Sequence, residues 1–211
     1  YAPRTKADPE AILAAVEAIE RAERPILYTG GGVINAGPEA CRTLRALVEA
    51  TGFPITSTLM GLGAYPGSGK AWVGMLGMHG TFEANWAMHD CDVMINIGAR
   101  FDDRVTGRTD KFSPDSRKIH VDIDRSSINK IVPVDVGIVG DVGRVIEDMV
   151  KIWKGRQHRK QDLSGWWKKI EGWRAKKSLA YKSSRDAIMP QDAIRKLWEA
   201  THRKAPIITT E

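Results

Sequence analysis

The sequence contains few cysteines and no long apolar run. Cys41 and Cys91 are the only cysteines among 211 residues, too few for a disulfide framework or a cysteine-based metal site, and they fit a reducing cytoplasm. The apolar runs are far shorter than the roughly 18 residues that a membrane helix requires, so we expect no membrane partner. No signal peptide and no internal repeat is visible. The usual dinucleotide fingerprint, G-x-G-x-x-G, is also absent.

The net charge of +6 does not indicate nucleic-acid binding once it is divided along the chain. Residues 1–150 hold 16 Lys and Arg against 20 Asp and Glu, whereas residues 151–185 hold 12 against 2. In this basic segment, Trp166, Trp167, Ile170 and Trp173 recur at near-helical spacing. The pattern is typical of a helix that packs on its domain and exposes a basic face. Base stacking on these tryptophans is the alternative, but we expect no nucleic acid.

Apolar strands alternate with helical segments along most of the chain. This alternation predicts an α/β fold, a Rossmann-like open parallel sheet of about six strands with helices on both faces. A helical extension is expected at the C-terminal end. The expected strands are 25–29, 53–57, 92–97, 118–123 and 135–139, and the expected helices are 11–21, 38–50, 81–89, 142–153, 163–182 and 190–201.

Glycine-rich and polar motifs follow the expected strands. Open parallel sheets bind ligands at the carboxyl ends of their strands, so these motifs should converge there. The most charged of them places two arginines and two aspartates between Arg100 and Arg104. Such a cluster is costly to bury without partners, which implies a polyanionic ligand or an ion-pair network. A phosphate-bearing cofactor could use it. The converging motifs are residues 30–32, 58–61, 76–79, 98–104, Asp122 and 140–142.

Each motif also has a simpler structural explanation. Three consecutive glycines after a strand mostly mark a tight turn. Asp122 could bind a ribose hydroxyl or cap the following helix. His79 could be an ordinary loop histidine, Met78 could fill a core, and Asp103 could pair only with a neighbouring arginine. Convergence of six motifs on one edge of one sheet favours a binding site over these separate roles.

Five segments resemble the acetohydroxyacid synthase (acetolactate synthase) family of thiamine-diphosphate enzymes, specifically the central domain of the catalytic large subunit. The most specific are Met75-Leu-Gly-Met-His-Gly-Thr81 and Arg100-Phe-Asp-Asp-Arg-Val-Thr-Gly107; the others are residues 27–32, 56–63 and 120–124. The resemblance implies a cytoplasmic bacterial enzyme that uses thiamine diphosphate, Mg²⁺ and FAD. It also implies condensation of pyruvate with a second 2-keto acid, pyruvate or 2-ketobutyrate, in branched-chain amino acid biosynthesis.

The resemblance further implies which residues hold FAD, whose role in the family is structural. Arg100 is implied as a charge partner of the FAD diphosphate, and Asp122 and Ile123 lie towards the adenosine half. Asp103 and Arg104 are implied near the substrate channel. The implied cofactor-binding residues are Gly31, Thr58, Leu59, Leu76, Gly77, Met78, His79, Gly98, Ala99, Arg100, Phe101, Asp102, Asp122, Ile123, Asp141 and Val142.

The same resemblance predicts that the chain is one part of a larger catalytic subunit. We expect a linker and entry helix in residues 1–23, the FAD-binding central domain in 24–154, and connecting helices with the start of the thiamine-diphosphate-binding domain in 155–211. The family's catalytic glutamate and its Mg²⁺ ligands lie outside these residues, so no catalytic or metal-binding residue is expected and the chain should be inactive alone. The family implies a homodimer or higher oligomer and a regulatory small subunit.

Two alternatives and one further hypothesis stay open at this point. The chain could belong to another flavin-bearing thiamine enzyme, of the pyruvate oxidase or glyoxylate carboligase type, although the motif that begins at Arg100 argues against it. It could also be an interaction module that keeps the sheet without a cofactor. If the tryptophans of residues 151–185 are exposed, they should favour self-association of the chain.

Overall fold

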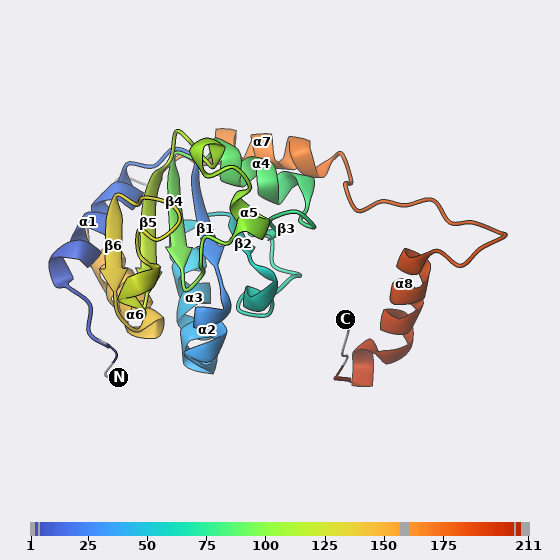
Figure 1. Cartoon of the computed structure of the whole chain (residues 1–211), viewed down its shortest axis with the longest axis horizontal. Coiled ribbons are helices and arrows are strands. Elements are labelled where there is room, and N and C mark those ends of the chain that lie inside the picture. The colour runs from blue at the N-terminus through green and yellow to red at the C-terminus, as the bar shows by residue number, and fades with distance from the viewer. Residues whose placement is uncertain (1–2, 4, 157–160, 205, 208–211) are drawn as a thin grey trace. The chain divides into compact units, whose positions relative to one another are not determined.

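The structure, a computed structural model, describes residues 3, 5–156, 161–204 and 206–207 (Figure 1). Its described strands form one six-stranded sheet in the order β3-β2-β1-β4-β5-β6, and neighbouring strands are parallel. This confirms the predicted fold class. The strands are β1 (Pro25–Thr29), β2 (Ile55–Ser57), β3 (Trp72–Met75), β4 (Val93–Ile97), β5 (Arg117–Asp122) and β6 (Val136–Val139).

The strand order reverses between β1 and β4, the two strands at the centre of the sheet. The chain first builds outward from β1 through β2 to β3, and then returns to the other side of β1 with β4, β5 and β6. This order is that of doubly wound nucleotide-binding sheets, in which ligands bind at the reversal point. In Figure 1 the strand arrows point to the lower edge of the sheet, where α2 (Gly31–Asn35) follows β1.

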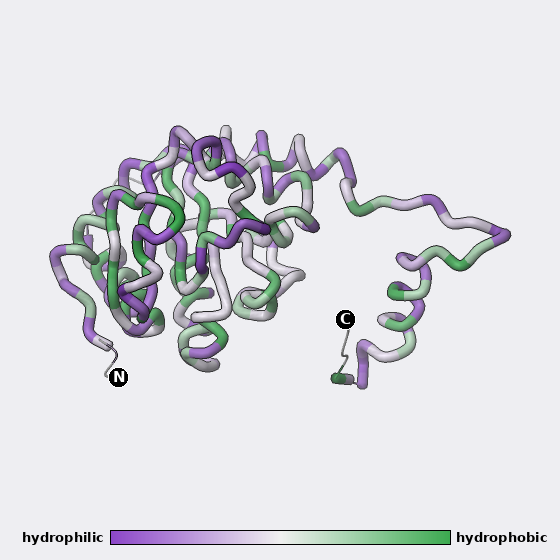
Figure 2. Tube along the Cα trace, in the orientation of Figure 1, coloured by the Kyte–Doolittle hydropathy of each residue, from purple (hydrophilic) through white to green (hydrophobic). Residues whose placement is uncertain are grey.

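Three helices bury one face of the sheet. The helices α1 (Pro9–Glu20), α3 (Pro38–Thr51) and α6 (Val142–Gly155) pack with inward side chains of the strands such as Leu27 and Ile95. Neighbouring strand residues point to opposite faces, so Ile26, Tyr28 and Met94 belong to a second core on the other side. Because both faces are covered, hydrophobic (green) segments run through the sheet in Figure 2. The exception is β5, whose sequence Arg-Lys-Ile-His-Val-Asp is largely polar.

The second face is covered by α4 (Phe82–Asp90) and α7 (Ser164–Arg174). Trp166 and Ile170 of α7 are buried in this second core, and the indole Nε1 of Trp166 donates to the carbonyl oxygen of Pro25 at 2.9 Å. The lysines beside them are exposed. The prediction of a helix packed on its domain with a basic solvated face is therefore confirmed.

The packing of α7 removes the basis of the self-association hypothesis. Trp153 and Trp166 are buried, and Trp167 and Trp173 are half-buried, so little of their apolar surface is left for a second copy. The predicted helix 163–182 was too long: α7 ends at Arg174, and Lys177 has a positive φ of 49°.

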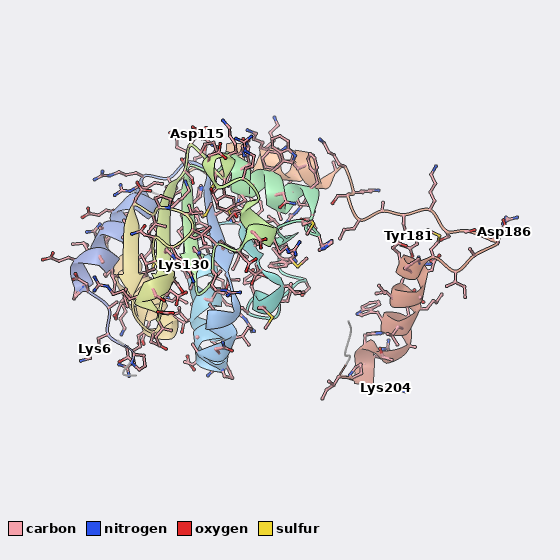
Figure 3. The ribbon with its side chains drawn as sticks, in the orientation of Figure 1. Lys6, Asp115, Lys130, Tyr181, Asp186 and Lys204 are labelled. Carbon is pink, nitrogen blue, oxygen red and sulfur yellow. The ribbon has the colours of Figure 1, made fainter. Side chains whose placement is uncertain are left out.

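The chain divides into two compact units, Tyr1–Lys176 and Lys177–Glu211. The first holds the sheet together with α1 and α7. The second holds α8 (Pro190–Thr201), which confirms the predicted helix 190–201. The hydroxyl of Tyr181 donates to Asp192 at 2.9 Å and joins the preceding segment to this helix (Figure 3). Part of the domain start expected within 155–211 falls on residues 208–211, and part of the linker expected within 1–23 falls on residues 1, 2 and 4; both sets lie outside the described residues.

Three elements were not predicted from the sequence. Strand β3 is short and contains Gly74 at φ 98°, so it shows no clear alternation. Helix α2 starts inside the glycine triplet, and α5 (Asp103–Thr106) starts inside the charged cluster. None of the described helices has the length and apolar character needed to cross a bilayer.

Candidate functional site

A cavity of about 720 Å³ opens at the carboxyl edge of the sheet. Its walls come from the turns that follow β1, β2, β3, β4 and β5, so it spans the reversal point between β1 and β4. We call it the switch-point cavity. Its volume falls within the range of about 300–1,000 Å³ that is typical of ligand and cofactor sites. It is lined by Gly31, Gly32, Asn35, Thr58, Leu59, Met60, Met75, Leu76, Met78, His79, Gly98, Ala99, Arg100, Asp102, Arg104, Val105, Asp122, Ile123 and Ser127.

Most of the predicted cofactor residues lie in the wall of this cavity, and so does Arg104 of the predicted substrate channel. Asp103 instead lines a neighbouring cavity of about 260 Å³ that shares Arg100 and Asp102 with the first. Six lining residues were not among the cofactor residues implied by the sequence. Gly32, Met60, Met75 and Val105 lie within the motifs singled out above, whereas Asn35 and Ser127 lie outside them.

Asp141 and Val142 are not part of this cavity. The side chain of Asp141 accepts a hydrogen bond from the backbone N–H of Arg144 at 3.1 Å and caps α6. Val142 is buried in the core between the sheet and its helices. The turn also contacts the segment before α1, because the backbone N–H of Asp141 donates to the carbonyl oxygen of Thr5. Both residues therefore have structural roles in this chain.

The glycine turn after β1 touches the turn after β4, backbone against backbone. A Cβ on Gly30 would lie 2.4 Å from the carbonyl oxygen of Gly98 and 2.5 Å from the Cα of Ala99. A Cβ on Gly32 would lie 2.7 Å from the Cα of Gly98. The glycines on either side of Gly31 thus join the two central turns. Gly31 itself lines the cavity.

Gly77 joins the loops after β3 and β4 and is absent from the cavity wall. Its φ is 96°, and an added Cβ would lie 2.7 Å from the carbonyl oxygen of Arg104. The side-chain amide of Asn85 bonds both its N–H and its carbonyl, at 2.8 and 3.0 Å. The next N–H, that of Met78, donates to the carbonyl oxygen of Arg104 at 3.0 Å. This junction places Met78 and His79 in the wall.

Arg100 and Arg104 bring positive charge to the cavity. The guanidinium of Arg100 lies 3.2 Å from the carboxylate of Asp102, and its side chain is 78% exposed. Asp102 caps α5; its hydrogen bonds with the Asp103 side chain and the Arg104 N–H, together with both arginines, hold its pKa below its usual range. An exposed ion pair of this kind contributes only about 0–1 kcal/mol. Arg100 can therefore exchange Asp102 for a phosphate at small cost.

Asp122 and Thr58 have structural partners in addition to their places in the wall. One carboxylate oxygen of Asp122 accepts from the backbone N–H of Asp124 at 2.8 Å, whereas the side chain that caps the following short helix is that of Asp124. The hydroxyl oxygen of Thr58 accepts from the N–H of Gly61 at 3.1 Å. The second carboxylate oxygen of Asp122 lies 3.8 Å from the ring of His120. Asp122 can therefore cap its turn and still offer an oxygen at the cavity.

The cavity also has a large apolar side. Leu59, Met60 and Met78 line it and are 68%, 74% and 61% exposed. Solvent-exposed side chains of this size, gathered beside a hollow, mark a surface that a ligand or another protein segment covers. Together with the two arginines, they suit a ligand with a flat apolar part and an anionic part. Within the described residues, no cluster of His, Cys, Asp and Glu is arranged to hold a metal ion.

Sequence reasoning missed three polar side chains beneath the loop that carries Arg100. Tyr28, Asn96 and His120 are fully buried and hydrogen-bond to the backbone of that loop. The sequence does contain one sign of these residues, which is that each lies within a buried strand. A buried polar side chain needs a hydrogen-bond partner, so each of them was a candidate for a structural hydrogen bond. Phe101, which the resemblance implies as a cofactor residue, is buried beside two of them, with ring centroids 6.1 Å from Tyr28 and 5.1 Å from His120.

Comparisons with known proteins agree with this geometry. The family described as "Thiamine pyrophosphate enzyme, central domain" matches residues 12–149. The acetolactate synthase isozyme 3 large subunit of Escherichia coli is 41% identical over 203 residues, which cover 95% of this chain and 35% of that protein. The acetolactate synthase of Mycobacterium leprae is 43% identical over 201 residues, which cover 94% of this chain and 32% of that protein. The chain thus spans about a third of the length of these curated relatives.

Proposed function

Since the chain belongs to the thiamine pyrophosphate enzyme family and matches its central domain, we propose that its switch-point cavity binds FAD within an acetolactate synthase large subunit. The observation that carries this proposal is the cavity itself, in which the turns of five strands bring together most of the residues that the sequence implies for FAD. The names of the relatives support the identity of the whole protein.

The lining chemistry fits FAD. Arg100 would hold the diphosphate, because a guanidinium forms forked hydrogen bonds with phosphate oxygens. Gly31 and Gly98 leave the backbone open to a close approach. Asp122 would accept from hydroxyls of the adenosine half, beside Ile123. Leu59, Met60 and Met78 would cover the flavin. When bound, FAD would supply a rigid aromatic surface and no net redox step.

We propose that the whole protein condenses pyruvate with a second 2-keto acid, either pyruvate or 2-ketobutyrate, in branched-chain amino acid biosynthesis. Thiamine diphosphate and Mg²⁺ would bind mainly outside this chain. Residues 24–154 would form the FAD-binding domain, and residues 155–211 would lead to the next domain. We also infer a cytoplasmic location, a homodimeric or larger catalytic subunit and a regulatory small subunit. Asp103 and Arg104 would border the substrate channel.

The strongest alternative is an interaction module with no cofactor. The exposed apolar residues of the cavity would then be a protein contact. The two arginines beside them argue for an anionic ligand, because a purely apolar contact gains nothing from those charges. FAD binding separates the two possibilities.

The Arg100→Ala substitution is expected to weaken FAD binding by about 1.5–3 kcal/mol, the range for a hydrogen bond to a charged group. The side chain is mostly exposed, so the fold should be unaffected. Arg108→Ala is a matched control, because Arg108 pairs with Asp110 and does not line the cavity. Equilibrium titration of both variants with FAD measures the effect. Equal FAD affinities in the two variants would show that Arg100 does not bind the diphosphate.

The 211-residue chain is expected to form no acetolactate from pyruvate, even with thiamine diphosphate, Mg²⁺ and FAD present. Carboligation needs a bound thiamine cofactor and a positioned acid-base group, and the sequence resemblance assigns both to other parts of the enzyme. A discontinuous colorimetric assay for acetolactate, compared with a buffer blank, gives the result. Turnover above the blank would mean that the catalytic residues lie within this chain.

A further inference from the structure

Three buried side chains form hydrogen bonds with the backbone of Ala99 and Arg100. They come from the three adjacent central strands β1, β4 and β5. The hydroxyl of Tyr28 donates to the carbonyl oxygen of Arg100 at 3.1 Å. The amide of Asn96 accepts from the N–H of Ala99 at 3.1 Å and donates to its carbonyl oxygen at 2.8 Å. The ring of His120 lies 3.0 Å from the same carbonyl oxygen. We call Tyr28, Asn96 and His120 the loop clamp.

The loop clamp is fully enclosed. All three side chains are 0% exposed, and Phe101 packs between the rings of Tyr28 and His120. Polar groups at this depth destabilise a fold unless they are hydrogen-bonded, and apolar residues would fill the same space at lower cost. Core packing alone therefore does not account for three polar side chains at these positions. The clamp fixes three consecutive peptide units, from the one that joins Gly98 to Ala99 to the one that joins Arg100 to Phe101.

The geometry determines which ring nitrogen of His120 carries the proton. The carbonyl oxygen of Ala99 can only accept, so Nε2 of His120 is the donor and Nδ1 bears a lone pair. Nδ1 is buried, and within the described residues it has no hydrogen-bond partner. Burial lowers the pKa of His120, against a smaller opposing effect of the Asp122 carboxylate and the Ala99 carbonyl. The ring is thus neutral, and the clamp holds the loop through hydrogen bonds.

The loop needs such support because it has no regular structure of its own. It leaves β4 through Gly98 at φ 65° and reaches α5 only at Asp103. Ala99, Arg100 and Asp102 line the switch-point cavity. An arginine binds phosphate with forked geometry only if its backbone is held in place. A loop fixed in advance also loses less conformational entropy when the ligand binds.

We propose that Tyr28, Asn96 and His120 are positioning residues that set the affinity of the cavity for a diphosphate ligand without touching it. This inference rests on the proposed FAD site, and it identifies the side chains that fix the loop of residues 98–102, which carries Arg100. Loss of one clamp hydrogen bond should weaken FAD binding about 2- to 10-fold, the effect of one net hydrogen bond.

Four variants of the full chain test the clamp. Tyr28→Phe removes only the hydroxyl. His120→Leu removes the donor, and His120→Gln returns an N–H donor on a side chain of similar reach. Ser116→Ala is the control, because the Ser116 hydroxyl makes a buried hydrogen bond to the carbonyl of Ser113 just before β5, at the opposite end of that strand from the cavity. FAD affinity is measured by titration, and amide hydrogen exchange of residues 98–102 is measured without ligand.

Faster exchange of residues 98–102 and weaker FAD binding are expected in Tyr28→Phe and His120→Leu, with His120→Gln close to wild type in both. Ser116→Ala should change neither. Wild-type FAD affinity in Tyr28→Phe and His120→Leu overturns the proposal, and so does an equal loss of affinity in Ser116→Ala. If His120→Leu does not fold, the FAD affinity of Tyr28→Phe alone tests the proposal. If the wild-type chain binds no FAD, the proposed function fails, and unchanged exchange in Tyr28→Phe then overturns the clamp separately.

Discussion

The Trp166→Ala substitution is expected to lower the free energy of unfolding by about 3–5 kcal/mol, the usual range for a buried tryptophan. Trp166 is 3% exposed and belongs to the second core, and its ring centroid lies 5.7 Å from that of Trp173. Truncation also leaves the carbonyl oxygen of Pro25 without the indole N–H that it accepts from. Since Pro25 begins β1, losing this hydrogen bond also destabilises a central strand of the sheet.

Denaturant unfolding of Trp166→Ala beside Trp198→Ala measures this effect. Trp198 lies on α8 in the second unit and is 61% exposed, so its truncation should change stability by less than about 0.5 kcal/mol. A small effect at Trp166 would mean that α7 is dispensable. In that case the domain would end near residue 154, and a chain shortened there would fold.

The Gly30→Ala substitution is expected to destabilise the first unit by about 3 kcal/mol, the upper end of the range for overpacked positions. Gly30 has a φ of −129°, which any residue can adopt, so the cost is steric alone. The new methyl group would meet the backbone of Gly98 and Ala99 at 2.4 and 2.5 Å. Backbone at the centre of a sheet cannot move aside as a flexible side chain does. The turns after β1 and β4 must therefore separate.

The control for Gly30→Ala is Gly67→Ala, because a Cβ on Gly67 would meet nothing within 4 Å. It should leave stability close to wild type. The separated turns should also widen the cavity around Gly31, so FAD binding should weaken in Gly30→Ala and stay unchanged in Gly67→Ala. Equal stability of the two variants would show that the turns after β1 and β4 are not packed as described.

The sequence was sufficient to predict the fold class and most of the cavity wall. Five of the six strands were predicted, and four of these are mainly apolar runs bounded by glycine or proline. The glycine triplet after β1 was expected to form a tight turn, and a Cβ on Gly30 or Gly32 would collide with the turn after β4. It could not be predicted from sequence that the glycines on either side of Gly31 contact protein backbone. That distinction depends on the β4 turn, which comes from a distant part of the chain.

Tertiary context decides which of two roles a residue has, and the sequence alone does not contain that information. Phe101 sits in the most charged motif, yet it is buried between Tyr28 and His120. Asp141 follows a strand as the other motifs do, but it caps α6. Strand β6 is at the edge of the sheet, away from the reversal point, so its turn does not reach the cavity. The strand order, which the sequence leaves open, determines which turns converge.

The most direct test of the proposed function is an equilibrium titration of the purified 211-residue chain with FAD, followed by flavin fluorescence and repeated at high salt. We expect saturable binding of one FAD per chain, weaker in Arg100→Ala and weaker at high salt because Arg100 contacts the phosphates. A correctly folded chain that binds no FAD at any salt concentration would contradict it.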